Sequence, residues 1–251
     1  MYRNLSKKIF HVIMIIVIIV AILCVAGIFI LRYQVEGESN MPFKITKINI
    51  VESVEGIDNQ EAQEKWNFKV NHNNDIYVYV VKNNDYGKTE FIEKIEVKNI
   101  NINKQEELGE LKLYKPVLDE KKMFINATEN EITEITYERE LEADKIPYIK
   151  ELKISNQGGK LGFRYAINNI SQYVSEQDEQ IDHSQLLKLT GIKPENLKTN
   201  LSFDIIINLI SGKKYQATVN LDIPSDEIIE KSPVGIEIRD LEDIIFKRIE
   251  N

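Results

Sequence analysis

The chain contains little cysteine and histidine, and this scarcity limits its chemistry. Cys24 is the only cysteine among 251 residues, and it lies within a long apolar stretch. The remainder of the chain therefore offers no disulfide, thiolate metal site or cysteine nucleophile. Only three histidines occur, so we expect no histidine-based metal centre. Stability must come from the packing of a hydrophobic core.

Basic residues are also few in the body of the chain. Residues 1–31 contain Arg3, Lys7 and Lys8 and no acidic side chain. Removing these three from the 32 Lys and Arg residues leaves 29 basic side chains against 40 acidic ones. An acidic body repels phosphate backbones, so we expect no nucleic-acid partner.

The apolar stretch is long enough to cross a membrane. No charged residue occurs from Ile9 to Leu31, and a helix of this length spans about 35 Å, against a hydrocarbon core of about 30 Å. A cleaved signal peptide has a shorter apolar region, and its best cleavage site here, Cys24-Val25-Ala26, is followed by more apolar residues. Lipid modification of Cys24 is disfavoured because the bulky Leu23 precedes it. We therefore predict a retained anchor, with cleavage and lipidation as the alternatives.

Basic residues predict the orientation of this anchor. They are concentrated before the stretch, whereas Arg32 is followed by Glu36 and Glu38. Positive flanks stay in the cytoplasm. The sequence thus predicts a single-pass protein of the cell membrane, with a cytoplasmic N-terminus and an extracytoplasmic body.

Most of the body shows the alternating pattern of β-strands. Apolar residues recur at every second position in "KLGFRYAIN", "LSFDIIINL" and "KYQATVNLDIP", which lines them along one face of a strand. "SGKK" and "NQGG" are predicted turns, with Gly212 free to adopt a positive φ. In "FKITKINIV" the apolar phase changes after Ile45, which predicts a bulge near Thr46 and Lys47. "DIYVYVV" has the composition of a central strand, and "NHNND" and "KNNDYG" have that of turns.

We therefore predict a mainly β protein: an N-terminal transmembrane helix followed by two β-sandwich-like regions, with a short helical insertion in the second. "DHSQLLKLTG" provides that insertion, because Asp182 can cap a helix and Gly191 can end it. The pattern leaves open whether the two regions are independent domains or one sheet system. The predicted parts are a cytoplasmic tail, a transmembrane helix, a connector, two β-rich domains and a C-terminal tail or edge element, at 1–8, 9–31, 32–42, 43–146, 147–225 and 226–251.

Nothing in the sequence predicts a catalytic, cofactor-binding or metal-binding residue. "DHS" at 182–184 contains the residue types of a hydrolase triad, but adjacent residues at a helix start do not converge on one atom. His72 is predicted to lie in the polar turn "NHNND". That turn and "SEQDEQID" carry oxygen ligands for calcium, yet neither has the spacing of a calcium loop.

Aromatic side chains give the one candidate surface. A group of them at strand spacing can form a surface that binds carbohydrate or protein, although such residues also pack as core or cross-strand pairs. The candidate interaction residues are Trp66, Tyr77, Tyr79, Tyr165 and Tyr173.

The chain resembles an uncharacterised family of single-span membrane proteins from low-GC Gram-positive bacteria. The segments that carry the resemblance are "EGESNMPFKITKINI", "NQGGKLGFRYAI" and "LSFDIIINLISGKKYQATVNLDIP". The resemblance implies a bacterial cell membrane and an outward-facing body, and it assigns no activity or site residue. We therefore expect a non-enzymatic interaction module whose partner is an envelope protein or a wall component. The alternative is a cell-wall hydrolase or transferase that uses carboxylates alone.

Overall fold

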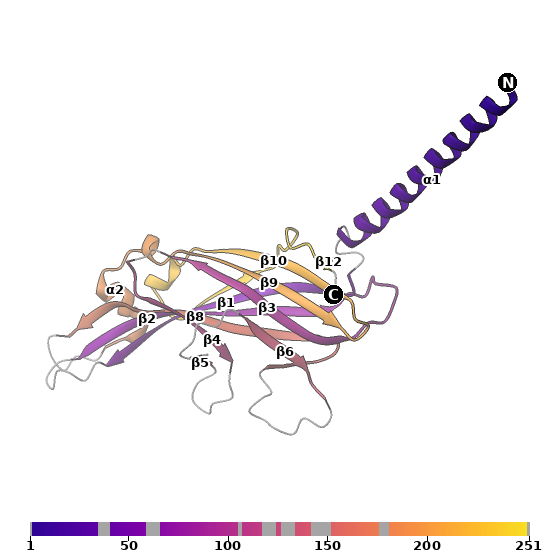
Figure 1. Cartoon of the computed structure of the whole chain (residues 1–251). Coiled ribbons are helices and arrows are strands. Elements are labelled where there is room, and N and C mark those ends of the chain that lie inside the picture. The colour runs from indigo at the N-terminus through magenta and orange to yellow at the C-terminus, as the bar shows by residue number, and fades with distance from the viewer. Residues whose placement is uncertain are drawn as a thin grey trace.

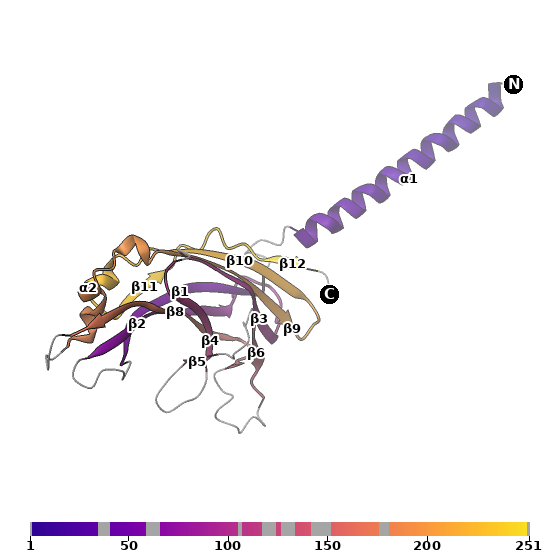
Figure 2. The same cartoon turned by 60° about the vertical axis from the view of Figure 1, so that its left-hand side comes forward.

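The computed structural model describes residues 2–34, 41–58, 66–104, 107–116, 124–126, 134–141, 152–175 and 181–249. It consists of one long N-terminal helix, α1 (Tyr2–Gln34), and a body made mainly of β-strands. α1 projects away from the strands in both views (Figures 1 and 2). Its segment Phe10–Phe29 has a mean hydropathy of 3.5 and is 0% buried, so the protein itself covers none of this apolar helix.

The strands form two six-stranded sheets. Sheet A has the order β11 (Val234–Ile238), β1 (Phe43–Asp58), β2 (Asn67–Lys82), β8 (Gly158–Val174), β4 (Glu110–Pro116) and β5 (Phe124–Asn126). Sheet B has the order β12 (Lys247–Ile249), β10 (Lys214–Ile223), β9 (Thr199–Leu209), β3 (Ile92–Asn103), β6 (Ile135–Arg139) and β7 (Lys153–Ile154). Neighbouring strands are antiparallel except β6 and β7.

The two predicted β-rich regions do not form separate sheets. In sheet A, β8 from the region 147–225 lies between β2 and β4 from the region 43–146. In sheet B, β3 from the first region pairs with β9 from the second. Hydrogen bonding therefore joins both regions into one sheet system, which answers the question that the sequence pattern left open.

Side chains of both sheets share the main hydrophobic core. Sheet A contributes residues such as Ile48, Val78 and Phe163, and sheet B contributes residues such as Phe203 and Val219. The rings of Phe163 and Phe203 meet edge to face with centroids 5.3 Å apart. These residues are the alternating apolar positions of the sequence, so period-2 patterning accounts for the core.

Most of the local predictions are confirmed. The register of β1 and β2 shifts between Ile45 and Lys47, as the change of apolar phase predicted. Gly212 has a φ of 81° in the β9–β10 turn. β2 lies between β1 and β8, as expected for a central strand. At the helical insertion, Asp182 caps a 3-10 turn (His183–Gln185) that leads into α2 (Leu186–Thr190), and Gly191 ends it in a left-handed conformation.

The prediction of a turn at "NHNND" is wrong. Residues 71–75 continue β2 and are all buried. Asn and Asp favour turns as isolated residues, but here neighbouring strands pair with β2 on both sides along this segment, so its backbone groups bond within the sheet. The C-terminal segment forms two edge strands, β11 in sheet A and β12 in sheet B.

Tyr137 joins the two sheets by hydrogen bonds. Its hydroxyl, on β6 of sheet B, donates to the carbonyl of Gly162 at 2.6 Å and accepts from the Gly162 amide at 3.2 Å. Gly162 lies on β8, beyond the residues that pair with β4. The phenol therefore takes the place of a neighbouring strand at this point. Burial raises the pKa of the Tyr137 hydroxyl well above its ordinary value, so it remains a donor.

We expect Tyr137→Phe to lower the free energy of unfolding by about 1–3 kcal/mol, because two buried backbone groups of Gly162 lose their partner. Urea unfolding of the full chain in detergent, followed by the fluorescence of Trp66, measures this change. Tyr114→Phe is the control, since the hydroxyl of Tyr114 accepts only a long 3.3 Å bond from Asn168. Equal stability of Tyr137→Phe and the wild type would contradict the role given to the hydroxyl.

Candidate functional site

The predicted interaction residues fall into three places. Tyr77 and Tyr79 are half-buried on the outer face of β2, away from the core. Trp66 lies at the other end of β2, is 45% exposed and stacks on Phe68 with ring centroids 5.6 Å apart. Tyr173 lies in the same region, since it is paired with Phe68 across β2 and β8. It packs against a second, smaller hydrophobic cluster, whose members include Phe68, Val70, Leu186 and Ile228. Tyr165 is 0% exposed, in the main core. The structure therefore brings together Tyr77 and Tyr79 and leaves the other three apart from them.

Each of these two tyrosines lies under a lysine. The ammonium group of Lys47 is 4.6 Å from the centroid of the Tyr79 ring, and that of Lys160 is 4.9 Å from the Tyr77 ring. Contacts of this kind hold a cation against the negative face of the ring. The Tyr77 ring also covers Gly162, where an added Cβ would lie 3.2 Å from it. The Tyr77 ring thus lies against β8, and a lysine ammonium group contacts each of the two rings.

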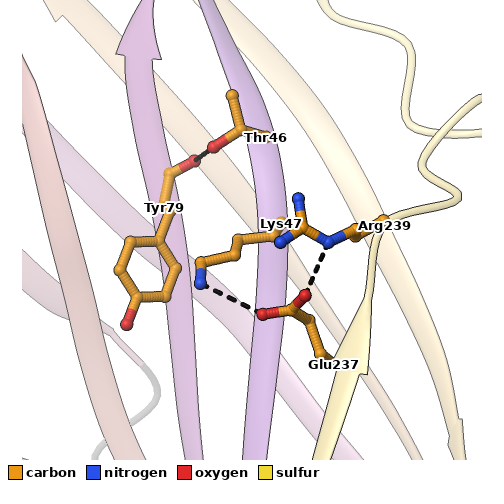
Figure 3. Close-up of polar contacts among 5 residues, drawn as sticks. All are labelled: Thr46, Lys47, Tyr79, Glu237 and Arg239. Carbon is orange, nitrogen blue, oxygen red and sulfur yellow. Dashed lines mark hydrogen bonds and ion pairs between the residues drawn. The ribbon is translucent and has the colours of Figure 1, made fainter.

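Charged groups surround the Lys47–Tyr79 pair (Figure 3). The carboxylate of Glu237 on β11 accepts from Lys47 Nζ at 3.1 Å and from Arg239 Nε at 2.5 Å. The hydrogen bonds from Lys47 and Arg239 lower the pKa of Glu237. The hydroxyl of Thr46, in the bulge of β1, donates to the carbonyl of Tyr79 at 3.4 Å. The bulge therefore places Lys47 between an aromatic ring and a carboxylate.

A bidentate ion pair adjoins Tyr77 on the same face. Arg164 on β8 donates to both carboxylate oxygens of Asp75, and the Nη2–Oδ2 distance is 2.9 Å. Burial, reinforced by the charge of Asp75, raises the pKa of Tyr77 to about 12. This outer face, with Lys47, Tyr77, Tyr79, Lys160 and Glu237, is called the tyrosine–lysine face below. It presents aromatic rings, ammonium groups and carboxylates together, which suits polar recognition of another molecule.

The raised pKa of Tyr77 makes stability depend on alkaline pH. The unfolded chain ionises this phenol near pH 10, whereas the folded chain keeps it neutral to about pH 12. Its contribution is therefore complete below pH 10 and is lost as the pH rises from 10 to 12. We expect Tyr77→Phe to make the decline of stability in this window shallower, as measured by urea unfolding at several pH values. Asp75→Asn should move the titration of Tyr77 toward pH 10 in ultraviolet difference spectra, and an unmoved titration would contradict this assignment.

A second polar arrangement, which was not predicted from the sequence, lies inside the body. The inward positions of β1 run Ile48, Ile50, Glu52 and Val54, so a carboxylate interrupts an apolar stripe. On β2, His72 and Asn74 occupy two consecutive inward positions, between Val70 of the smaller cluster and Ile76 of the main core. We call the group that separates the two clusters the buried polar layer; its members are Glu52, His72, Asn74, Tyr165, Thr199 and Ser225.

Hydrogen bonds connect the layer around Glu52. The hydroxyl of Ser225 bonds to Glu52 Oε1, and His72 Nε2 lies 3.3 Å from the same oxygen. His72 Nε2 is also 3.5 Å from Asn74 Nδ2. The hydroxyls of Tyr165 and Thr199 bond to each other. Glu52 and His72 are 1% and 0% exposed, so the layer is sealed from solvent.

The layer holds the residue types of a hydrolytic triad in a different order. In such triads the histidine lies between the hydroxyl and the carboxylate and takes the proton of the hydroxyl. Here Glu52 lies between Ser225 and His72. Ser225 therefore bonds to a carboxylate, without an imidazole that activates it. This geometry fits a structural network that fixes how β1, β2 and the segment after β10 pack together.

The remaining predicted candidates have plain structural roles. Asp182 Oδ1 accepts from the Ser184 amide at 2.9 Å and from its hydroxyl at 2.7 Å, so "DHS" is a helix cap, as predicted. "NHNND" is part of β2, and "SEQDEQID" lies largely outside the described residues. Within the described ranges, no three His, Cys, Asp or Glu side chains are grouped to hold a metal ion.

The buried polar layer left a signal in the sequence. Strand alternation places Glu52, His72 and Asn74 at inward positions once "NHNND" is included in β2. A polar residue at an inward position is expected to pair inside the core. The Asn-rich composition of "NHNND" instead indicated a turn, in which His72 and Asn74 would have no inward positions.

Comparison with known proteins gives no relative for this fold and these sites. No protein-family model matches the chain, and no curated protein or solved structure is significantly similar to it.

Proposed function

We propose that the chain is a single-pass membrane protein whose β-rich body acts outside the cytoplasm as a non-enzymatic interaction module of the cell envelope. One observation carries the membrane part of the proposal. Phe10–Phe29 forms an apolar helix that is 0% buried in the protein. This segment of 20 residues is apolar except for His11, so its exposure is unfavourable in water, and its length matches the thickness of a bilayer core. Arg3, Lys7 and Lys8 before the helix favour a cytoplasmic N-terminus.

The interaction part rests on how the body distributes its polar groups. The two sheets share one core, which supports a sandwich of two packed layers. The triad-type residues of the buried polar layer are sealed from any substrate. The tyrosine–lysine face, in contrast, is partly exposed and presents rings held by Lys47 and Lys160. We propose this face as the contact for an envelope protein or a wall component.

Anchoring is tested on the full chain in cells. Ile16→Lys with Val20→Lys places two charges in the apolar segment, which disfavours insertion. The wild type should stay with membranes during alkaline extraction and keep the intact mass of residues 1–251, whereas the double variant should be released. A mass that lacks the N-terminal segment would show cleavage. Labelling of Glu195→Cys, in a Cys24→Ala background, by a membrane-impermeant maleimide tests whether the body lies outside.

The interaction face is tested by photo-crosslinking in living cells. A photoreactive amino acid at Tyr79 should give one reproducible crosslinked product from the envelope, and Lys47→Glu should abolish that product. The control position is Asn220, which is exposed on the outer face of sheet B. The same products at both positions, or none at Tyr79 with abundant folded protein, would overturn the assignment of this face.

A further inference from the structure

The end of the body nearest to α1 is defined by strand ends from both sheets. β1 begins there opposite the end of β2, with Phe43 paired to Lys82. β3 begins opposite the end of β9, with Ile92 paired to Leu209. The Ile92 amide, in sheet B, donates to the Asn156 carbonyl in the turn that precedes β8 of sheet A. The Ile210 amide donates to the Phe91 carbonyl, which joins the end of β9 to the start of β3 within sheet B. We call this region the α1-proximal end and the opposite region the distal end.

The chain holds the α1-proximal end close to α1. The side-chain amide of Asn83, at the end of β2, donates to the Met41 carbonyl at 2.9 Å, and its backbone amide donates to the Pro42 carbonyl. The point where the chain enters the body is thereby fixed at this end. Only residues 35–40 separate Met41 from the end of α1 at Gln34. Seven residue steps span at most about 25 Å, so Met41, at the start of this end, stays within that distance of the end of the helix.

The α1-proximal end is basic in a chain whose net charge is −8. The segments 41–47, 81–91, 155–160, 209–214 and 247–249 contain nine basic side chains and two acidic ones. The basic residues are Lys44, Lys47, Lys82, Lys88, Lys160, Lys213, Lys214, Lys247 and Arg248, and the acidic ones are Asp85 and Glu90. Two of these lysines are paired with acidic side chains: Lys213 Nζ lies 2.6 Å from Glu90 Oε1, and Lys47 Nζ lies 3.1 Å from Oε2 of Glu237, a residue outside the counted segments.

The distal end has the opposite balance. Its segments 53–58, 66–70, 171–175, 181–198 and 224–232 contain five basic and seven acidic side chains. Large apolar side chains are exposed at both ends: Phe91 and Ile210 at the α1-proximal end are 39% and 49% exposed, and Leu189 at the distal end is 49% exposed. Apolar exposure alone therefore does not distinguish the ends. The two ends differ in their basic charge and in the length of chain that connects them to α1.

From these features we infer that the α1-proximal end docks on the anionic headgroup surface of the bilayer that holds α1. Lysines close to such a surface bind it electrostatically, and neighbouring apolar side chains enter the boundary between headgroups and acyl chains. Phe91 and Ile210 lie on adjacent turns, with Lys88 and Lys214 close to them in sequence. Docking directs the α1-proximal end toward the bilayer and leaves the acidic distal end in solvent. This inference rests on the proposed anchoring by α1.

The test uses the full chain, with Cys24→Ala, in lipid nanodiscs. A single cysteine replaces Ile210 at the α1-proximal end or Leu189 at the distal end, two positions with the same 49% exposure. Each carries a fluorophore, and lipids with spin-labelled headgroups quench it on contact. We expect strong quenching at position 210 and little at position 189 when the discs contain phosphatidylglycerol. Equal quenching at both positions would overturn the docking.

Charge dependence and a separate test of the anchor complete the experiment. Each of the changes Lys88→Gln and Lys214→Gln should lower the equilibrium constant for docking by about fivefold. The matched control, Lys69→Gln with Lys193→Gln at the distal end, should leave it unchanged. Quenching at position 210 that is the same in discs of phosphatidylcholine alone would exclude anionic recognition. A fluorophore at Val20 reports on the anchor, because spin labels on lipid acyl chains quench it only when α1 lies in the bilayer. If the fluorophore at Val20 is not quenched, the proposed anchoring is wrong. If it is quenched while the fluorophore at position 210 remains in solvent, only the docking is wrong.

Discussion

Replacing Glu52 with alanine should lower the free energy of unfolding by about 3–5 kcal/mol. Glu52 is 1% exposed and is the common partner of Ser225 and His72 in the buried polar layer. Its removal leaves a hydroxyl and an imidazole buried without their acceptor. Among the described residues, His72 Nδ1 has no hydrogen-bond partner, so the loss of the contact at Nε2 leaves the ring poorly satisfied. Buried groups in this condition lose their hydration without compensation.

Urea unfolding of the full chain in detergent, followed by near-ultraviolet circular dichroism, measures this loss. Glu52→Gln keeps an acceptor oxygen and should be less damaging than Glu52→Ala. The control is Glu55→Ala, an exposed residue on the same strand, which should change stability by less than about 0.5 kcal/mol. If Glu52→Ala and Glu55→Ala unfolded at the same urea concentration, the layer would not hold the strands together.

The second large effect is expected from Phe163→Ala, at about 3–5 kcal/mol. The Phe163 ring is 0% exposed on β8 and meets the ring of Phe203 on β9. Alanine removes apolar contact area from the main core and leaves a cavity that rigid strands on both sides cannot close. The loss should appear as a lower midpoint in thermal unfolding.

A double-mutant cycle separates the packing between the sheets from simple loss of volume. Phe203→Ala and the double variant complete the cycle, and we expect a coupling energy of about 0.5–1.5 kcal/mol for an edge-to-face pair. Val174→Ala is the control for a lost apolar side chain, since Val174 is 50% exposed. Strict additivity of the two phenylalanine changes would argue against direct contact between the layers.

The sequence predicts those parts of the fold that depend on neighbouring residues. The alternation in "LSFDIIINL" and "KYQATVNLDIP" located two strands, and the change of phase after Ile45 located a bulge. Asp182 and Gly191 marked the ends of the helical insertion correctly. Each signal acts over a few residues, so one sequence is enough to detect it.

Strand order depends on contacts between distant residues, and local patterns do not encode it. β8 joins β2 and β4 although a stretch of other elements intervenes in the chain. The turn prediction for "NHNND" is wrong for the same reason. Strands pair with β2 on both sides, and this pairing between distant residues overrides the preference of Asn and Asp for turns. The strand pattern around Tyr165 is consistent with either an exposed or a buried side chain. Its burial depends on the sheet that packs against this face, which the local sequence does not specify. The tyrosine–lysine face was therefore identified only in part, through Tyr77 and Tyr79.

The pairing of β1 with β11 has a consequence for synthesis. Lys47 and Glu237, joined across these strands, are 190 residues apart in the chain. Long-range pairs of this kind give a high contact order and slow folding. Sheet A cannot be completed until Val234–Ile238 has left the ribosome, long after β1 and β2 have been synthesised. A chain that ends before Val234 would leave β1 as an unpaired edge, so premature termination near the C-terminus should yield a protein that aggregates or is degraded.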